Sequence, residues 1–472
     1  MKDKLQAILT PHDQQHVLDF WDTLDAAGRQ HLADQIASLD LELIEQLYRA
    51  GGEVEDLGPV ALRAAPPPAI RLSGDQRPFS AAEARECGQA ELRAGHVAAI
   101  LVAGGQGTRL GFPHPKGMYP VGPLSGATLF QIFIEQIRAT AARYGAPIPL
   151  YVMTSPATDE ATREFFDRQQ RYGLDRQDLI VFCQGTMPAV DAQTGHLLLA
   201  DRGTLCTSPD GHGGMLAALQ RSGTLDEMHR RGLKHLFYFQ VDNPLATVCE
   251  PEFLGSHVLA NSEYSLQVVA KRDPLEKVGN VVQVDGVSRV IEYSDLPLEA
   301  AERRNDDGSL VLWAGSIAVH AFDLPFLRRV AEDRASLPFH RACKKVSHLD
   351  GQGQRVQPAE PNAIKFERFI FDLLPLARRS ICIEVDPAEA FAPVKNAPRA
   401  ETDTAEIAQQ MMMALHRRWL REAGATVDDQ VRVEISPLFA SDPQQLATKI
   451  PPGSVITQDT YFHDQAQGPP QA

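Results

Sequence analysis

Residues 96–122 read HVAAILVAGGQGTRLGFPHPKGMYPVG. The opening stretch, 96–102, is a compact apolar run with β-branched side chains, which predicts a buried strand. Gly104, Gly105 and Gly107 follow, so one short loop lacks three β-carbons. Backbone N–H groups in such a loop can approach a phosphate or a base edge closely. The segment therefore predicts a strand that ends in an anion-binding loop.

The same loop carries polar and cationic side chains. Thr108 offers a hydroxyl donor, and Arg109 and Lys116 supply positive charge for a triphosphate. Pro113 and Pro115 restrict the backbone that leads to Lys116. The Walker pattern G-x-x-x-x-G-K-[ST] is absent, and GGQGTRLG does not keep the dinucleotide pattern G-x-G-x-x-G. A plain tight turn between a strand and a helix is the alternative.

Apolar runs of strand length alternate with helical stretches along the centre of the chain. Further buried strands are predicted at 149–155, 179–184, 235–243 and 265–271, and helices at 80–94, 128–145, 161–173 and 214–232. This alternation predicts an α/β fold with a mixed, mainly parallel sheet that helices cover on both faces. Ligands bind such sheets at the carboxyl ends of the strands, which is where the glycine loop falls.

The two ends of the chain have a different character. Residues 1–50 carry apolar residues at helical spacing and predict two or three amphipathic helices. The three prolines within 61–72 predict a linker or a wrapping strand, and 280–295 predicts a hairpin with an Asp-Gly turn. The tail has short strand patterns. We expect three parts, namely a mostly helical N-terminal segment, a catalytic domain, and a C-terminal helix with a small β-rich part, at 1–95, 96–395 and 396–472.

Composition narrows the possible classes of protein. The chain has 472 residues and a net charge of -15, which argues against a general nucleic-acid binder because such proteins need an excess of Lys and Arg. No run of about 18 apolar residues occurs, so no membrane span is expected. The N-terminus lacks the pattern of a secretory signal, and the six cysteines have no metal-binding spacing. We expect a cytoplasmic protein.

The glycine loop is the first of a longer series of motifs. LVAGGQGTRLGFPHPKGMYPVG, at 101–122, resembles the signature of the UDP-sugar pyrophosphorylases (UDPGP type 1), and of their UDP-N-acetylhexosamine pyrophosphorylase branch in particular. The resemblance continues, in the family's order, through FCQGTMPA (182–189), SPDGHGG (208–214), VDN (241–243), VGNVV (278–282), VIEYS (290–294), AGSIA (314–318), PNAIKFE (361–367) and FAPVKNA (391–397). Ordered blocks over roughly 98–397 argue strongly against a chance match.

The resemblance implies a glycosyltransferase-A-like, Rossmann-like fold of the nucleotide-diphospho-sugar transferase type. It also implies a reaction in which UTP and a sugar 1-phosphate give a UDP-sugar and pyrophosphate, with Mg²⁺ as cofactor. In-line attack on the α-phosphorus requires two anions held in line and the developing charge neutralised. The branch implies N-acetylglucosamine 1-phosphate as the sugar, while glucose and galactose 1-phosphate stay open.

Residues assigned to the nucleotide come from the loop and from three later motifs: Ala103, Gly104, Gly105, Gly107, Thr108, Gln184, Gly211 and Asp242. The Gln184 amide can donate and accept at once, which matches the edge of uracil, and the resemblance implies that it reads the base. Asp242 ends an apolar run, where a carboxylate beside phosphates is a natural Mg²⁺ ligand. The alternatives are an amide that caps a turn at Gln184 and an aspartate that N-caps the following turn at Asp242.

The remaining candidates concern phosphate transfer and the sugar. The catalytic candidates are Arg109, Lys116 and Lys395, and the resemblance places Lys395 at the transferred phosphate. The sugar-binding candidates are His212, Gly279, Glu292, Ser316 and Lys365. His212 and Ser316 stand where N-acetyl-sugar enzymes usually carry Asn, which leaves the sugar open. The alternatives are a surface Arg109, a cross-strand charge pair at Glu292, and solvated side chains at Lys365 and Lys395.

Two other classes of function share part of this pattern. One is a glycosyltransferase that uses a UDP-sugar as donor, and the other is a non-catalytic nucleotide-sugar sensor. The two cations of the glycine loop favour the reaction of a triphosphate over sugar transfer by a glycosyltransferase. The presence of Lys116, Asp242 and Lys395 together favours a catalytic protein over a sensor.

Overall fold

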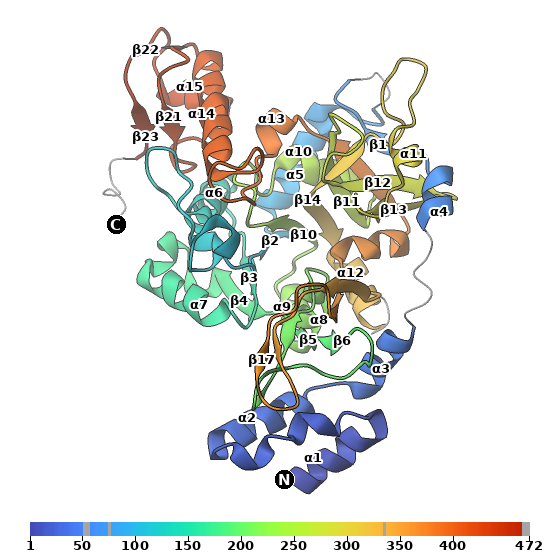
Figure 1. The fold of residues 1–472 in the computed structure, drawn as a ribbon. Helices are drawn as coiled ribbons and strands as arrows, with labels where there is room; N and C mark the ends of the chain where they lie inside the picture. The colour runs from blue at the N-terminus through green and yellow to red at the C-terminus, as the bar shows by residue number, and fades with distance from the viewer. Residues whose placement is uncertain (51–56, 74–76, 334–336, 465–472) are drawn as a thin grey trace. The chain divides into compact units, whose positions relative to one another are not determined.

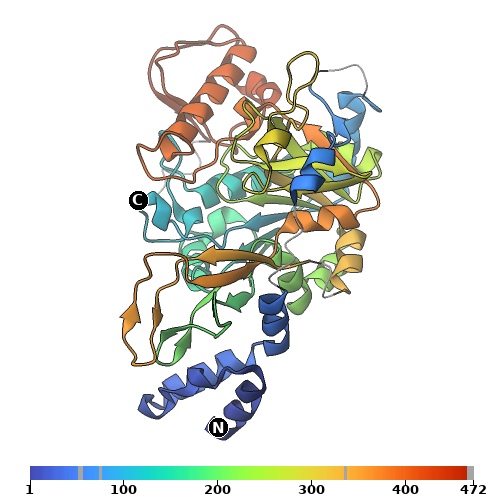
Figure 2. The same cartoon turned by 45° about the vertical axis from the view of Figure 1, so that its right-hand side comes forward.

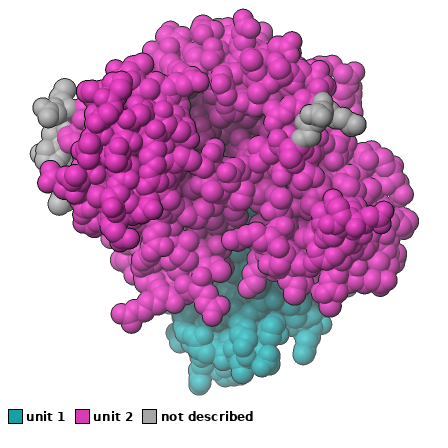
Figure 3. Space-filling model, turned by 90° about the horizontal axis from the view of Figure 1, so that it is seen from above, with its two compact units in different colours: residues 1–56, 184–218, 334–372 teal, residues 57–183, 219–333, 373–472 magenta. Residues whose placement is uncertain are grey.

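The computed structural model describes residues 1–50, 57–73, 77–333 and 337–464 (Figure 1, with a second view in Figure 2). The chain forms two compact units, each built from three separate segments of sequence (Figure 3). The first unit comprises Met1–Asp56, Gln184–Ala218 and Arg334–Asp372, and the second comprises Leu57–Cys183, Leu219–Asp333 and Leu373–Ala472. The sequence-based division into 1–95, 96–395 and 396–472 stays a prediction.

The second unit is built on a sheet in the order β1-β19-β11-β14-β10-β2-β3-β4, with β12 and β13 paired beside β14. Its strands are β1 (Ala69–Ile70), β2 (Val97–Val102), β3 (Leu150–Thr154), β4 (Leu179–Cys183), β10 (His235–Gln240), β11 (Tyr264–Ala270), β12 (Gly279–Val284), β13 (Val287–Ile291), β14 (Ala314–Asp323) and β19 (Ser380–Glu384). β10, β2, β3 and β4 run parallel, whereas β14 is antiparallel to both β10 and β11. The α/β class and the mixed, mainly parallel sheet are confirmed.

The strands form where the apolar runs predict them. β2, β3, β4, β10 and β11 fall on the five runs, and β2 is buried along nearly its whole length. The predicted hairpin is β12–β13, and its turn residues Asp285 and Gly286 both have positive φ, 51° and 84°. An Asp-Gly pair suits this turn because it tolerates the left-handed backbone that two-residue hairpins require.

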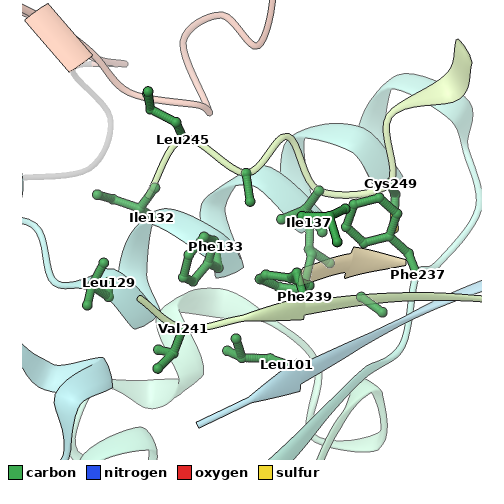
Figure 4. Packing of buried hydrophobic residues seen from close by; sticks show 14 of the residues in the cluster. Leu101, Leu129, Ile132, Phe133, Ile137, Phe237, Phe239, Val241, Leu245 and Cys249 are labelled. Atoms are coloured by element: carbon green, nitrogen blue, oxygen red, sulfur yellow. The ribbon is translucent and has the colours of Figure 1, made fainter. Parts of the chain in front are cut away.

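Helix α6 (Leu129–Tyr144) covers the centre of this sheet (Figure 4). It begins after Thr128, whose hydroxyl accepts a hydrogen bond from Gln131 N at 3.2 Å, and it ends at Gly145, which has a φ of 70°. Phe133 is fully buried, and its ring centroid lies 4.9 Å from that of Phe239 in β10. Truncating such a core phenylalanine to alanine typically costs about 3–5 kcal/mol.

The other helices of the second unit include α4 (Leu57–Arg63), α5 (Ala81–Arg93), α7 (Asp159–Arg168), α9 (Thr224–Arg230), α10 (Pro251–Leu259), α11 (Leu298–Ala301), α12 (Leu324–Ala331) and α13 (Pro387–Ala390). α5 and α10 pack in close contact because each has a glycine at the crossing. A β-carbon on Gly88 would lie 1.9 Å from Pro251 O, and one on Gly255 would lie 1.7 Å from Ala84 O. Among the described residues, no helix is both long enough and apolar enough to cross a membrane.

Two predicted helical stretches are shorter or broken. Instead of one run over 214–232, the chain forms α8 (Gly214–Arg221) and α9, separated at Gly223, whose φ is 71°. The stretch predicted at 161–173 is helical only to Arg168, after which Arg171 and Tyr172 adopt positive φ. In both places the left-handed backbone interrupts the helical hydrogen bonds although apolar spacing continues.

The first unit combines the N-terminal helices with short strands. Its elements are α1 (Lys2–Leu9), α2 (Ala26–Ala37), α3 (Leu41–Arg49), β5 (Thr186–Pro188), β6 (Val190–Asp191), β7 (Leu199–Asp201), β8 (Thr204–Leu205), β9 (Thr207–Pro209), β15 (His340–Lys344), β16 (His348–Leu349), β17 (Arg355–Val356) and β18 (Ala363–Glu367). α2 and α3 each begin after an aspartate that caps the helix, Asp25 and Asp40. The helices share one core with strand residues such as Val190 and Phe366.

The C-terminal part of the second unit has its own small core around Leu420, Val433 and Leu446. It contains α14 (Ala405–Glu422), α15 (Pro443–Lys449), β20 (Thr426–Val427), β21 (Val433–Ile435), β22 (Val455–Ile456) and β23 (Thr460–Phe462). The strands pair as expected for a β-rich tail, but α15 was not predicted. Asp442 caps α15 by accepting from Gln445 N at 2.7 Å, and Pro443 occupies its first turn.

Candidate active site

The glycine loop joins β2 to the 3-10 turns η4 (Thr108–Leu110) and η5 (Lys116–Met118). Gly107 N donates to His114 O at 2.9 Å, and Lys116 N donates to Gly105 O at 3.0 Å, so the two arms of the loop are tied together. A β-carbon on Gly107 would lie only 2.9 Å from His114 O. Gly105 is exposed, and a β-carbon there would meet nothing within 4 Å. Its open side leaves room for an anion beside the backbone.

Ser155 anchors the start of this loop from the neighbouring strand. Its hydroxyl donates to Gly104 O at 2.7 Å, directly after β3. Ala103 packs into the core, so only its backbone can face a ligand, whereas Thr108 and Arg109 are exposed. Sequence reasoning missed Ser155, although a serine at the end of a predicted strand beside the loop was the available signal.

Predicted charged residues come together at the carboxyl ends of β2 and β10. Lys395 Nζ lies 3.7 Å from Asp242 Oδ2. Burial lowers the pKa of Lys116, the Asp242 carboxylate opposes that shift, and the charges of Lys395 and Arg109 add to it. All three residues are therefore near enough to Lys116 to affect its charge. Three cations around a strand-end carboxylate favour the binding of a polyanion.

A second carboxylate, Asp403, belongs to the same cluster. Its backbone oxygen accepts from Lys395 N at 2.8 Å and from Asn396 N at 3.0 Å. Burial raises the pKa of the Asp403 carboxyl, the Lys395 charge opposes the shift, and the Asp242 charge adds to it. Sequence reasoning missed Asp403, because nothing in the loop between Lys395 and α14 shows that it folds back on the lysine.

Asn243 fixes the segment that carries Lys395. Its Nδ2 donates to Ala390 O at 2.7 Å, and its Oδ1 accepts from Ala392 N at 3.0 Å. The adjacent Asp242 O accepts from Val394 N at 2.7 Å. The end of β10 therefore holds the chain on the N-terminal side of Lys395 through backbone and side chain together.

The sugar-binding candidates of the second unit also lie together. Gly279 of β12 is the Cα partner of Ser316 in β14. Glu292 follows β13, and its Oε1 would lie 3.6 Å from a β-carbon on Gly279. Ser316 Oγ accepts from Ala318 N at 3.3 Å, and Ala318 has a φ of 58° where β14 shifts register against β11. The irregular strand thus presents Ser316 beside Gly279 and Glu292.

The remaining candidates belong to the first unit. Gln184 is 7% exposed and leads into β5, which pairs with β9. Asp210 N donates to Gly185 O at 3.1 Å, so Gln184 and Gly211 lie on adjoining segments. Gly211 has a φ of 83°, and a β-carbon there would lie 2.3 Å from Arg368 O. Glycine is therefore required at 211 both by the backbone conformation and by the close contact.

His212 has a defined hydrogen-bonding state. Its Nδ1 accepts from Ile370 N at 3.1 Å, and its ring lies beside those of Phe369 and Phe371. Burial lowers the pKa of His212 to about 4, and the charge of His340 adds to the shift. The imidazole is neutral at pH 7 and carries its proton on Nε2, which leaves it a single N–H donor.

Lys365 lies in the same unit, on β18, where it pairs with Ala342 of β15. Its charge opposes the upward pKa shift that burial produces in the Cys206 thiol. A role of Lys365 at the sugar stays a prediction.

The fold and the site define a nucleotidyltransferase of the α/β class, with a glycine loop and a strand-end carboxylate at the carboxyl edge of the sheet. The family model described as UTP–glucose-1-phosphate uridylyltransferase matches residues 73–441. The chain belongs to this family of UDP-sugar pyrophosphorylases.

Individual relatives agree with this assignment. The chain is 39% identical over 432 residues to UDP-N-acetylhexosamine pyrophosphorylase-like protein 1 of Xenopus tropicalis, covering 88% of this chain and 84% of the relative. It is 39% identical over 350 residues to the UDP-N-acetylglucosamine pyrophosphorylase of Saccharomyces cerevisiae, covering 72% and 73% of the two chains. The crystal structure of the Trypanosoma brucei uridine diphosphate N-acetylglucosamine pyrophosphorylase superposes with a TM-score of 0.83 at 26% identity, covering 99% of each chain. The resemblance found in the sequence is confirmed, and the chain is a uridylyltransferase of nucleotide-sugar biosynthesis.

Proposed function

We propose that this chain transfers the uridylyl group of UTP to N-acetylglucosamine 1-phosphate, giving UDP-N-acetylglucosamine and pyrophosphate. The observation that carries the proposal is the convergence of Lys116, Asp242 and Lys395 beside the glycine loop. The relatives named as UDP-N-acetylglucosamine pyrophosphorylases support the choice of sugar.

In the proposed step, a phosphate oxygen of the sugar 1-phosphate attacks the α-phosphorus of UTP. A new O–P bond forms, the bond from the α-phosphorus to the oxygen bridging the β-phosphorus breaks, and pyrophosphate leaves with the electron pair. The attacking oxygen is already anionic, so no general base has to remove a proton. This agrees with a set of catalytic candidates that consists of cations, Arg109, Lys116 and Lys395, because the task is to hold anions in line and offset their repulsion.

Each part of the loop has a role in this proposal. The backbone at Gly104, Gly105 and Gly107 receives the phosphates, and Lys116 contributes charge from a half-buried position. A bound triphosphate favours the charged form of Lys116 and so offsets the effect of burial on its pKa. Lys395, which is 43% exposed, has the freedom to turn from Asp242 toward the transferred phosphate.

A magnesium ion fits the carboxylates of this cluster. The pKa of Asp403 is raised in part by the charge of Asp242, so the two carboxylates repel each other. A divalent cation would relieve that repulsion, and Mg²⁺ prefers oxygen ligands while keeping waters and phosphate oxygens in its shell. We propose that Asp242 and Asp403 hold the ion, which would neutralise charge on the pyrophosphate that leaves.

The base and the sugar are assigned to different residues. Gln184 is proposed to read the uracil edge, because a buried amide that both donates and accepts suits it. Gly211 offers backbone to the uridine, and the His212 Nε2–H offers one donor to a sugar hydroxyl. Gly279, Glu292 and Ser316 are proposed to bind the sugar, with the Glu292 carboxylate accepting from its hydroxyls.

A second candidate sugar is glucose or galactose 1-phosphate. Ser316 Oγ accepts from Ala318 N, which leaves the hydroxyl one O–H donor and one acceptor lone pair on a side chain shorter than the Asn that N-acetyl-sugar enzymes usually carry there. That observation favours a hexose without the N-acetyl substituent, and only a direct comparison of sugars separates the two assignments.

The test is pyrophosphate release from UTP with a panel of sugar 1-phosphates in the presence of Mg²⁺. The proposal expects release with N-acetylglucosamine 1-phosphate, and formation of the UDP-sugar in equal amount. Release only with glucose or galactose 1-phosphate would favour the second candidate. Binding of UTP or UDP-sugars without turnover would point to a sensor, and sugar transfer from a UDP-sugar would point to a glycosyltransferase.

A further inference from the structure

A cluster of two histidines and an aspartate lies at the opposite edge of the sheet from the glycine loop. His235 is the first residue of β10, His257 lies in α10, and Asp323 is the last residue of β14. Each of the three side chains offers one possible ligand atom, and these three atoms lie within 4.8 Å of one another. Asp242 follows the other end of β10, so at 3.3 Å per residue the cluster is roughly 20 Å from the active-site carboxylate. It takes no part in the proposed transfer.

Both histidines direct a ring nitrogen at the same carboxylate oxygen of the aspartate. His235 Nδ1 lies 2.8 Å and His257 Nε2 lies 3.0 Å from the same atom, Asp323 Oδ1. The two rings are nearly perpendicular, with an interplanar angle of 86°. Two imidazole nitrogens and a carboxylate that approach from different elements are a donor set suited to Zn²⁺, which is bound by His N and Asp O at about 2.0–2.2 Å.

The far nitrogen of each histidine also faces an oxygen. His257 Nδ1 lies 2.8 Å from Ser265 Oγ, and His235 Nε2 lies 3.6 Å from Glu91 Oε2. Glu91 Oε2 is in turn 2.6 Å from His96 Nδ1. Histidines that ligate metals typically have the second ring nitrogen oriented in this way by a hydroxyl, carboxylate or carbonyl group. The outer partners thus hold both rings with Nδ1 of His235 and Nε2 of His257 directed at Asp323.

Burial differs across the cluster. The side chain of His257 is completely buried, that of His235 is 12% exposed, and that of Asp323 is 30% exposed. The exposed side at Asp323 offers a path for an ion and a place for a water as fourth ligand. The buried side is fixed by the close packing of α5 on α10 at Gly88 and Gly255.

We propose that His235, His257 and Asp323 form a binding site for a divalent transition-metal ion of the Zn²⁺ type, with water as the fourth ligand. The ion would join β10, α10 and β14 at the edge of the sheet away from the nucleotide. Its effect is on stability, because a ligand that binds only the folded chain stabilises it in proportion to ln(1 + [L]/Kd). The opposing interpretation is a hydrogen-bonded His–Asp–His network that needs no ion.

The experiment uses the full chain, stripped with a chelator and returned to buffer that contains millimolar Mg²⁺, so that carboxylate sites for hard cations are occupied. Zn²⁺ binding is measured by isothermal titration, and Co²⁺ binding by its visible absorption spectrum. We expect one tight site per chain, a tetrahedral-type Co²⁺ spectrum, and a melting temperature that rises with Zn²⁺. Absence of a saturable site, or a Co²⁺ spectrum typical of six oxygen ligands, would overturn the proposal without any variant.

Variants localise the ion. Asp323→Asn keeps the size of the side chain, and His235→Gln removes one imidazole. Each is expected to weaken Zn²⁺ binding by more than about 100-fold and to abolish the Zn²⁺-dependent rise in melting temperature. The matched control is His340→Gln, which alters a histidine whose Nε2 lies 2.7 Å from Asp372 Oδ2. If Asp323→Asn and His235→Gln bind Zn²⁺ as the control does, the site lies elsewhere and the assignment is wrong.

Discussion

Lys395 Nζ lies 3.7 Å from Asp242 Oδ2, which is an ion pair without a short hydrogen bond, and the backbone joins the same two places through Val394 N and Asp242 O at 2.7 Å. The backbone contact fixes where the lysine starts, while its side chain stays 43% exposed. A half-exposed ion pair contributes little to stability. This agrees with the proposal that the lysine serves a bound phosphate.

Lys395→Ala tests this explanation directly. If the ammonium stabilises charge on the transferred phosphate, kcat for pyrophosphate release should fall on the order of 10²–10³-fold, while the melting temperature changes little. The control is Lys344→Ala, an exposed lysine on β15 of the first unit. A Lys395→Ala enzyme within about threefold of wild type would show that this lysine is only a solvated side chain.

Asn243→Ala tests whether the segment before Lys395 has to be held in place. The variant loses the bonds to Ala390 O and Ala392 N, and each such bond contributes about 1 kcal/mol. Because Asn243 acts through Lys395, kcat should fall roughly 10-fold or more with little change in KM for UTP. Asn243→Asp keeps the acceptor for Ala392 N but sets a second carboxylate oxygen, which has no proton to donate, against Ala390 O, so it should be at least as damaging as Asn243→Ala.

A suitable control for Asn243 is Asn305→Ala, which removes a bond to Ser309 within an exposed loop. If Asn243→Ala lowers the melting temperature but leaves kcat as high as the control does, the asparagine is structural and does not position Lys395.

The sequence predicted the sheet well because its strands are contiguous apolar runs bounded by glycine and polar residues, and β2 and β10 follow that pattern. It also predicted Lys116, Asp242 and Lys395 as charged candidates, and the structure brings them together. Asn243 and Asp403 could not be found in this way. Asn243 contacts the chain at Ala390 and Ala392, and Asp403 contacts Lys395 and Asn396. Neither apolar spacing nor glycine content encodes how this stretch of chain returns to the end of β10.

Local backbone effects account for the other differences. The break between α8 and α9 depends on one left-handed glycine, Gly223, within a stretch whose apolar spacing continues. Helix α15 forms in the β-rich tail because Asp442 and Pro443 start it. The glycine that breaks the first helix and the Asp-Pro pair that starts the second were visible in the sequence. The helical spacing around the glycine and the strand patterns around the Asp-Pro pair pointed to the other structure.

Gln184→Ala should impair discrimination among bases. In the proposal the buried amide pairs with the uracil edge, so wild type should prefer UTP strongly over ATP and GTP. Removing one partner of a buried hydrogen-bonded pair costs about 1–3 kcal/mol, or roughly 5- to 150-fold in kcat/KM for UTP. The measurement is pyrophosphate release with each nucleotide for wild type and variant. Equal turnover of UTP and ATP by wild type would rule out Gln184 as the residue that reads the base.

His416 should make the stability of the chain depend on pH. Burial lowers the pKa of His416 from 6.5 to about 4, with the backbone at Val433 opposing the shift, and Nδ1 accepts from Ile435 N at 3.3 Å. A depressed folded-state pKa means that the unfolded chain takes up the proton first, so stability is present above pH 6.5 and is lost as pH falls toward 4. At pH 5 this loss amounts to roughly 2 kcal/mol.

The measurement for His416 is urea unfolding at pH 8 and pH 5. His416→Gln keeps an acceptor but cannot titrate, so its stability should fall by roughly 2 kcal/mol less than that of wild type between the two pH values. His229→Gln, at an exposed position in α9, should keep the wild-type difference. Identical pH dependence in His416→Gln and wild type would mean that other groups control the acid transition.

Selectivity between sugars should depend on Ser316. Its Oγ accepts from Ala318 N, so the hydroxyl keeps one O–H donor and one acceptor lone pair, on a short side chain, for a sugar beside Gly279 and Glu292. An asparagine there would reach further and offer two N–H donors beside its carbonyl acceptor, so it could orient an acetamido group. One direct hydrogen bond of this kind is worth about 1 kcal/mol, or around a factor of five in selectivity.

We therefore expect Ser316→Asn to raise the ratio of kcat/KM for N-acetylglucosamine 1-phosphate over glucose 1-phosphate about fivefold. A wild-type ratio above a thousand that Ser316→Asn leaves unchanged would exclude this role, and His212 or Glu292 would then have to carry the selectivity.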